Sequence, residues 1–249
     1  MSRIRRRRLV VARISGMFPP VVIPTGGLGT RIRSLCPDLP KAMVPVNGEP
    51  FIAHQMRLLA REGVCDVVLC VGHLAKPLID FVGNGEQFGL SIRYCEDGEQ
   101  PLGTGGAIAR ASEMVASPFA VVYGDSYLDV PFAPIYQAFL TAGTSVLMTV
   151  YRNENRLIPS NLRVLANRVQ EYNKEHPAPD MVHVDFGLSI FDRGVFAGLV
   201  GKRFDLSEVI VPLIAEKQLA AYEINQRFYE VGTPEGVHDL ESHLEQQPK

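Results

Sequence analysis

The chain has 249 residues, 46% of them hydrophobic, so it is long enough to bury a complete core as one large α/β domain or two small ones. Its 25 basic and 27 acidic residues leave a formal charge of -2, which excludes a general attraction to nucleic acid or to a membrane surface. The four cysteines form no C-x-x-C pair, and Cys65 and Cys70 sit in or beside apolar runs. We therefore expect reduced core thiols in a cytoplasmic protein, without a disulfide or zinc framework.

Residues 1–16 are the one compositionally biased segment. They carry six arginines, and their apolar part, LVVA, is too short for a signal peptide or a membrane span. A nucleic-acid-binding or lipid-binding arm is one interpretation. We favour a disordered basic extension, with Met17 as the true start, and without its arginines the rest of the chain is clearly acidic.

Through residue 151, short β-rich runs alternate with amphipathic stretches. Helices are expected over 50–63, 103–116 and 132–143, where apolar residues recur at helical spacing. The expected strands are PVVIP (20–24), DVVLCVG (66–72), LSIRYC (90–95), FAVVYGD (119–125) and TSVLMTVY (144–151). Such alternation predicts a mostly parallel sheet with helices on both faces and a ligand site at the carboxyl ends of the strands.

After residue 151 the pattern changes to paired strands. We expect a helix around 206–216, a last helix from Pro234, and strands at NLRVLA (161–166), RVQEYNK (168–174), VHVDFGLSIF (182–191) and AAYEI (220–224). No linker rich in Gly, Pro or Ser and no repeat divides the chain. The prediction is one three-layer, Rossmann-like α/β domain with a small antiparallel extension.

Directly after the first strand comes PTGGLGTRIRSLCPDLPK (24–41), which combines flexible backbone with positive charge. The backbone N–H groups of such a loop can point at an anion. Its spacing fits neither G-x-G-x-x-G, whose last glycine is replaced by isoleucine, nor the Walker A loop, because no lysine follows the last glycine. A purely structural glycine turn stays open, but it gives no reason for Arg31, Arg33 and Lys41 to flank the loop.

This loop resembles the signature of the sugar-1-phosphate nucleotidyltransferases, G-G-x-G-T-R followed by P-K, present here at 26–31 and 40–41. Further motifs follow in the family's order: MVPVNGEPFI (43–52), VGNGEQFGLSIRY (82–94), PLGTGGAI (101–108), YGDSYLD (123–129), EYNK (171–174) and YEVGTPEGV (229–237). The resemblance runs from Val21 to the last helix. It implies a GT-A-like nucleotidyltransferase domain over 17–249.

The resemblance implies that an oxygen of a sugar 1-phosphate attacks the α-phosphorus of an NTP, so that pyrophosphate leaves and an NDP-sugar forms. Compact members include heptose- and mannose-1-phosphate guanylyltransferases, and we favour guanylyl transfer. Uridylyl, cytidylyl or thymidylyl transfer to another sugar phosphate is the alternative. A catalytically weak nucleotide-sugar sensor is the competing class, which the retained Arg31, Lys41, Asp125 and Glu230 disfavour. We expect a monofunctional protein. Whether it forms a homo-oligomer stays open.

Site residues for the nucleotide also follow from the resemblance. Arg31 and Lys41 are assigned to the triphosphate as catalytic cations, although a solvated surface lysine is the alternative for Lys41. The nucleotide itself is assigned to Thr25, Gly26, Gly27, Gly29, Thr30, Gly103, Thr104 and Gly105. The acidic run CEDGEQ (95–100) offers acceptors for the N1–H and amino group of guanine, or is a solvated loop.

The remaining assignments concern a metal ion and the sugar phosphate. Asp125 ends an apolar strand, where a carboxylate can hold Mg²⁺, unless it only caps a helix or turn. The family's second metal-binding aspartate is replaced here by Glu230, which binds the metal ion directly or through a water. Asp125 and Glu230 both follow strand-like runs. If these two strands end on one sheet edge, the two carboxylates converge. The sugar phosphate is assigned to Lys174, Asn173, Asp185 and Gly187, although Asp185 also suits a turn.

Deleting residues 1–16 should leave the melting temperature and turnover essentially unchanged, because the segment precedes the first strand and offers no apolar face to bury. Thermal denaturation and a turnover assay of the truncated and full-length chains check this. A large fall in melting temperature, or lost turnover, would show that the segment packs on the core.

Overall fold

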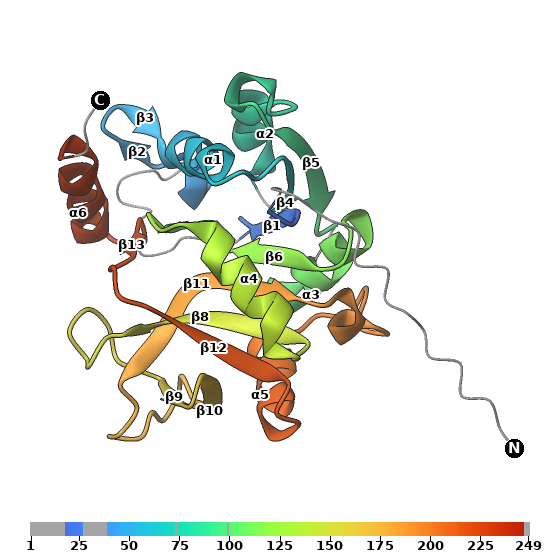
Figure 1. Cartoon of the computed structure of the whole chain (residues 1–249). Coiled ribbons are helices and arrows are strands. Elements are labelled where there is room, and N and C mark those ends of the chain that lie inside the picture. The colour runs from blue at the N-terminus through green and yellow to red at the C-terminus, as the bar shows by residue number, and fades with distance from the viewer. Residues whose placement is uncertain (1–17, 27–38, 73, 99, 247–249) are drawn as a thin grey trace, which may run out of the picture.

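A nine-stranded sheet runs through the computed structural model, which describes residues 18–26, 39–72, 74–98 and 100–246 (Figure 1). The strand order is β5-β4-β1-β6-β11-β8-β12-β10-β9. The strands are β1 (Val21–Pro24), β4 (Asp66–Val71), β5 (Ser91–Glu96), β6 (Phe119–Val122), β8 (Val146–Arg152), β9 (Leu162–Leu165), β10 (Arg168–Tyr172), β11 (His183–Phe191) and β12 (Leu219–Ile224). A strand was predicted at each of these positions, whereas the predicted extension at 1–16 lies outside the described residues.

The sheet has a parallel end and a mixed end. At the parallel end β5, β4, β1 and β6 run side by side, and β1, β4 and β6 are almost entirely buried because helices cover both faces. β11 then runs antiparallel to both β6 and β8, and the β9–β10 hairpin forms an antiparallel edge. The predicted α/β class is confirmed.

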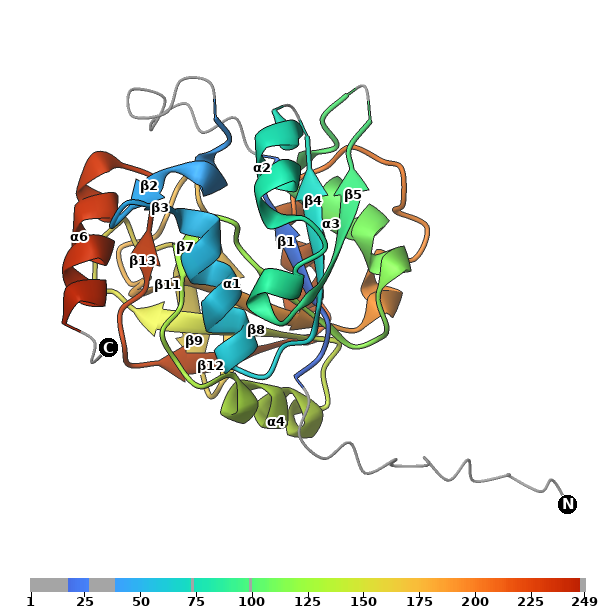
Figure 2. The same cartoon turned by 90° about the horizontal axis from the view of Figure 1, so that it is seen from above.

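Helices cover the two faces of the sheet (Figures 1 and 2). α1 (Phe51–Arg61), α2 (Ala75–Val82) and α4 (Phe132–Ala142) pack on one face, and α3 (Gly103–Ala111) and α5 (Ser207–Ala215) pack on the other. One apolar cluster fills each of these two interfaces. Short 3-10 turns lie at Lys41–Met43, Glu86–Phe88, Ser112–Met114 and Arg193–Phe196.

α2 is a helix that the sequence did not predict. It has eight residues, carries Pro77 in its first turn, and follows Leu74, whose backbone is left-handed (φ 66°) and which has no side-chain cap among the described residues. A helix this short, without a capping residue at its start, lacks the signals by which a helix is found in a sequence.

The last helix, α6 (Pro234–Glu245), packs beside the sheet on two short ladders (Figure 2). One ladder pairs β2 (Pro45–Val46) with β3 (Glu49–Pro50), and the other pairs β7 (Ser126–Tyr127) with β13 (Tyr229–Glu230). A third apolar cluster joins them through Val44, Val46, Phe51, Leu58, Tyr127, Val231, Val237 and Leu240. The C-terminal part of the chain is thereby held next to the end of β6.

Three of the four cysteines lie among the described residues. Cys70 and Cys95 are buried free thiols, as predicted, but Cys65 is exposed because it lies in the connection before β4 rather than in the strand. Cys36 lies outside the described residues. Within the described part of the chain, no helix has the length and apolar character needed to cross a bilayer.

Candidate active site

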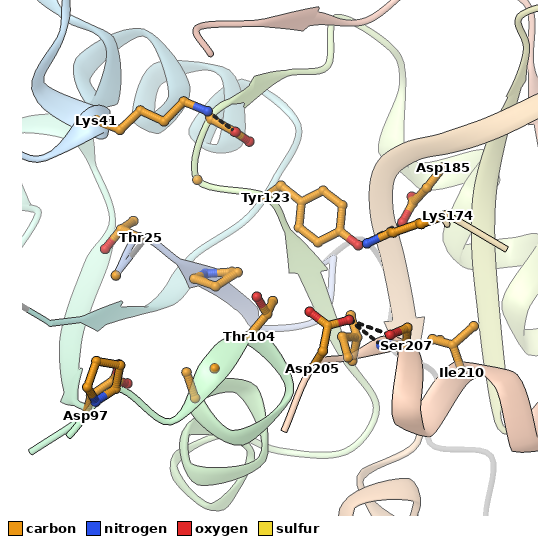
Figure 3. Close-up of a pocket in the computed structure, with 18 of the residues that line it drawn as sticks. Thr25, Lys41, Asp97, Thr104, Tyr123, Lys174, Asp185, Asp205, Ser207 and Ile210 are labelled. Carbon is orange, nitrogen blue, oxygen red and sulfur yellow. Dashed lines mark hydrogen bonds and ion pairs between the residues drawn. The ribbon is translucent and has the colours of Figure 1, made fainter. Parts of the chain in front are cut away.

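A cavity of about 560 Å³ opens where β1 and β6 end, between α3 and the segment that leads into α5. It brings together many of the residues assigned from the sequence: Thr25, Gly26, Lys41, Gly103, Thr104, Asp125, Lys174, Asp185 and Glu230. Figure 3 shows Thr25 and Asp97 on one side of this cavity and Tyr123, Lys174 and Asp185 on the other. The assigned Gly27, Gly29, Thr30 and Arg31 lie outside the described residues.

Three assigned residues do not line the cavity. Gly105 lies against Phe204, whose ring carbons would be 2.4 Å from an added Cβ, so this glycine permits packing within the protein. The side-chain oxygen of Asn173 accepts from the N–H groups of Glu175 (3.2 Å) and His176 (2.9 Å) and shapes a turn. Gly187, at φ 103°, donates its N–H to the carboxylate of Asp185 at 2.9 Å and so supports a residue that does line the cavity.

On the side of Thr25, side chains hold the ends of β1 and β4 together. The Thr25 hydroxyl and N–H both donate to the carbonyl of Cys70, at 2.7 and 2.9 Å, so this hydroxyl is already used within the protein. Asp97 lies beside Gly26, where an added Cβ would be 3.5 Å from its carboxylate. Burial raises the pKa of Asp97 above its usual value, against the opposing effects of the Leu102 N–H and Arg110.

The turn after β6 carries Asp125, and its position is fixed from α1. The Gln55 side chain is fully buried and donates to the carbonyls of Tyr123 and Ser126, both at 2.9 Å. The Asp125 carboxylate forms an ion pair with Lys41. Asp125 is therefore held at the cavity by backbone contacts on both sides.

Glu230 reaches the same place by a route that the sequence did not predict. Its strand, β13, is not part of the main sheet; instead Glu230 pairs with Ser126 in the short ladder next to the turn. The N–H of Val231 also donates to the carbonyl of Asp125 at 2.9 Å. Two carboxylates thus line one cavity, although the described residues contain no group of three or more His, Cys, Asp or Glu side chains placed to hold a metal ion.

The opposite side of the cavity is built around Asp185. Its carboxylate accepts from the Tyr123 hydroxyl at 2.7 Å and from the Gly187 N–H at 2.9 Å. Burial raises the pKa of Asp185, while these hydrogen bonds and Lys174 act in the opposite direction. Burial also raises the pKa of Tyr123 well above its usual value, so the phenol stays protonated and donates.

Lys174 supplies the positive charge on this side. Its ammonium lies over the Tyr172 ring, 5.4 Å from the centroid. Burial alone would lower the pKa of Lys174, but Tyr172, Asp205 and Asp185 together raise it, so the side chain stays charged at neutral pH. The cavity therefore offers one ammonium near Asp125 and another near Asp185.

The sequence and the fold were compared with known proteins. A family model described as nucleotidyl transferase matches residues 20–247. The chain belongs to the nucleotidyl transferase family. This family member is 29% identical over 221 residues to the mannose-1-phosphate guanyltransferase of Candida albicans, a match that covers 86% of the chain and 61% of that relative. It thus spans less than two thirds of the length of that protein.

Two further matches cover nearly all of the other protein. The D-glycero-alpha-D-manno-heptose 1-phosphate guanylyltransferase of Aneurinibacillus thermoaerophilus is 23% identical over 232 residues, which are 90% of this family member and 97% of the relative. The crystal structure of HddC from Yersinia pseudotuberculosis complexed with GMP-PN matches with a TM-score of 0.76 and 25% identity. That match covers 91% of this nucleotidyl transferase family member and 100% of the HddC chain.

Asp97 lines the cavity and belongs to the run CEDGEQ, whose carboxylates were offered as acceptors for guanine. Five further lining residues were not assigned from the sequence: Tyr123, Tyr172, Arg203, Asp205 and Ser207. The first two lie inside the motifs YGDSYLD and EYNK, which could have pointed to them. The segment 203–207 carries no motif. It reaches the cavity because Phe204 exchanges backbone hydrogen bonds with Leu102 (3.0 Å) and Gly105 (3.1 Å), a contact that spans about a hundred residues.

Asp185→Asn should stabilise this nucleotidyl transferase family member at neutral pH. Because burial raises the pKa of Asp185, the folded state holds this proton more tightly than the unfolded chain does, so its ionisation lowers stability as pH rises. The gain should disappear below about pH 4, where the acid is protonated in both states. Melting temperatures of the wild type and of Asp185→Asn, measured from neutral pH to below about pH 4, give this gain in stability.

The exposed Asp192, which accepts from Ser117 at 2.8 Å, offers the matched substitution Asp192→Asn. This control should show no such pH-dependent gain. If Asp185→Asn lowers the melting temperature equally at every pH, the buried carboxylate does not oppose folding and the expectation is wrong.

Proposed function

We propose that this protein transfers a guanylyl group from GTP to a sugar 1-phosphate of the heptose or mannose type, giving a GDP-sugar and pyrophosphate. Family membership over residues 20–247 and two relatives named as guanyl- or guanylyltransferases support the reaction class. The observation that carries the proposal is the cavity with an ammonium at each side, Lys41 and Lys174, because the reaction must bring two anions together.

In this proposal the two lysines hold different phosphates. Lys41 attracts the triphosphate and Lys174 attracts the sugar phosphate, whose oxygen attacks the α-phosphorus as the bond to the β-phosphate oxygen breaks. Each unit charge about 4 Å from a phosphate oxygen contributes ~4 kcal/mol at an effective dielectric near 20, before desolvation is subtracted. Little covalent chemistry falls to the protein, so positioning and neutralisation of charge supply the rate enhancement.

We further propose Mg²⁺ as the cofactor, held by Asp125 and Glu230. The residues fit this ion, since both are oxygen ligands lining one cavity and one of them already attracts a cation, Lys41. When bound, Mg²⁺ would offset the repulsion between the two phosphate groups. The free thiols Cys65, Cys70 and Cys95 and the NTP substrate support a cytoplasmic location as part of the proposal.

Asp97 supports guanine as the base. Guanine presents two adjacent donors, N1–H and its amino group, and a carboxylate can accept from both at once. Asp97 lines the cavity beside Gly26, at the end of β1 where the nucleotide is proposed to bind. Uracil and cytosine lack this pair of neighbouring donors, so the carboxylate favours guanine over them.

The proposed reaction is tested by phosphate release in the presence of pyrophosphatase, over four NTPs and the 1-phosphates of mannose, glucose and heptose. We expect the highest kcat/KM with GTP, and a fall in kcat of about 10²–10³ in Asp125→Asn, because a pre-positioned electrostatic group is lost. Asp80→Asn, which removes a carboxylate paired with Lys76 on the surface, is the control. Absence of release with every pair would refute the proposal and leave the nucleotide-sugar sensor.

Asp97→Asn should lower kcat/KM for GTP by about 10–100-fold, consistent with ~1–3 kcal/mol for a bidentate base contact, and leave the other NTPs nearly unchanged. The substitution keeps the size of the side chain but places an amide donor against donors of the base. Glu96→Gln changes the neighbouring acidic residue, which is exposed, and is the matched control. An equal fall for all NTPs would mean that Asp97 does not read the base.

A further inference from the structure

The ion pair between Lys41 and Asp125 joins the two residues that the proposed function assigns to different partners. In Figure 3 the Lys41 side chain extends toward a carboxylate, which is that of Asp125, and a dashed line marks the contact. The side chains are 22% and 31% exposed, so both are largely shielded from solvent. Lys41 and Asp125 line two cavities, the one described above and a neighbouring one of about 590 Å³. Glu230 lines both of these cavities as well.

The position of the ammonium is defined by packing as well as by charge. The end of the Lys41 side chain passes over Gly232, where an added Cβ would be 3.0 Å from Nζ and 3.7 Å from Cε. Gly232 lies two residues after Glu230 and one residue after Val231, whose N–H binds the carbonyl of Asp125. The segment that carries the second carboxylate thus also leaves the space that the ammonium occupies.

We propose that in the free protein the Lys41 ammonium occupies the cation position at Asp125, and that a divalent ion must displace it, which frees Lys41 for the triphosphate. This inference rests on the proposed function, because it uses the assignment of Asp125 to a metal and of Lys41 to the NTP. Its consequence is coupled binding. The free protein binds a divalent ion weakly, and ion and nucleotide strengthen the binding of each other.

The coupling follows from competition for one carboxylate. The fraction of molecules in which Lys41 has left Asp125 sets the apparent affinity for the ion, since only these molecules are competent to bind it. A nucleotide that engages Lys41 raises this fraction, so it favours the ion, and by linkage the ion favours the nucleotide to the same extent. Attraction between the ion and the phosphates adds to this effect but does not require Lys41 to move.

The first test measures Mn²⁺ binding to nucleotide-free protein by electron paramagnetic resonance at fixed ionic strength. Lys41→Met removes the charge but keeps most of the side-chain volume, and it should bind Mn²⁺ about tenfold more tightly than the wild type, which corresponds to ~1.4 kcal/mol. Lys41→Arg keeps a cation that can bind a carboxylate with two hydrogen bonds, so it should bind no more tightly than the wild type.

Two controls define the site of the change. Lys76→Met breaks the exposed ion pair with Asp80 and should leave Mn²⁺ affinity unchanged. Adding Asp125→Asn to Lys41→Met should abolish the gain. If Lys41→Met binds Mn²⁺ no more tightly than the wild type, or if Lys76→Met gains as much, the proposal is overturned.

A second test uses the unsubstituted protein, so that it does not depend on the folding of a variant. An amine-reactive ester is applied with and without Mg²⁺, and labelling at each lysine is measured by mass spectrometry. Labelling of Lys41 should rise with Mg²⁺, because its ammonium is released, while labelling of Lys76 should stay constant. Equal labelling of Lys41 in both conditions would overturn the proposal.

Both tests are independent of turnover. If no NTP and sugar phosphate react but Lys41→Met binds Mn²⁺ more tightly, the proposed function fails while the displacement of Lys41 stands. If turnover is as proposed but Mn²⁺ affinity does not change in Lys41→Met, the displacement fails alone.

Discussion

The turn that follows β6 is the constraint on which both sides of the cavity depend. The buried side-chain amide of Gln55 donates to carbonyls before and after Asp125, so α1 fixes the turn from beneath. A buried donor left without its acceptor costs ~1–3 kcal/mol, which makes separation of helix and turn unfavourable. From this one turn Tyr123 is directed toward Asp185 and Asp125 toward Lys41. The placement of charge on both sides of the cavity therefore follows from the position of a single short segment.

A second constraint joins the two sides of the cavity. An added Cβ would lie 2.6 Å from the Phe204 carbonyl oxygen at Gly103 and 2.4 Å from the Phe204 ring at Gly105, so only glycine permits this approach of α3 to the segment before α5. That segment carries Arg203, Asp205 and Ser207 into the cavity. The glycines of PLGTGGA, assigned from the sequence to the nucleotide, serve in part to bring the other side of the cavity close.

The sequence predicted the elements that local pattern determines. Apolar runs such as DVVLCVG marked the buried strands, while α2 was missed because it is short and lacks a capping residue. Lys174, Asp185 and Glu230 were assigned from motifs, and all three line the cavity. The ladder with Ser126 that brings Glu230 there was not predicted, because it pairs residues far apart in the chain. Asn173 does not line the cavity, because its side chain accepts from nearby backbone N–H groups.

The pairing of Glu230 with Ser126 also sets the order in which the site is completed during synthesis. Strands β1, β4, β5 and β6 lie in the earlier part of the chain and form the parallel end of the sheet, whereas β13 follows much later in the sequence. A nascent chain that has assembled this end contains Asp125 but not its partner carboxylate. The two carboxylates therefore line one cavity only after β13 has been synthesised and has paired with β7.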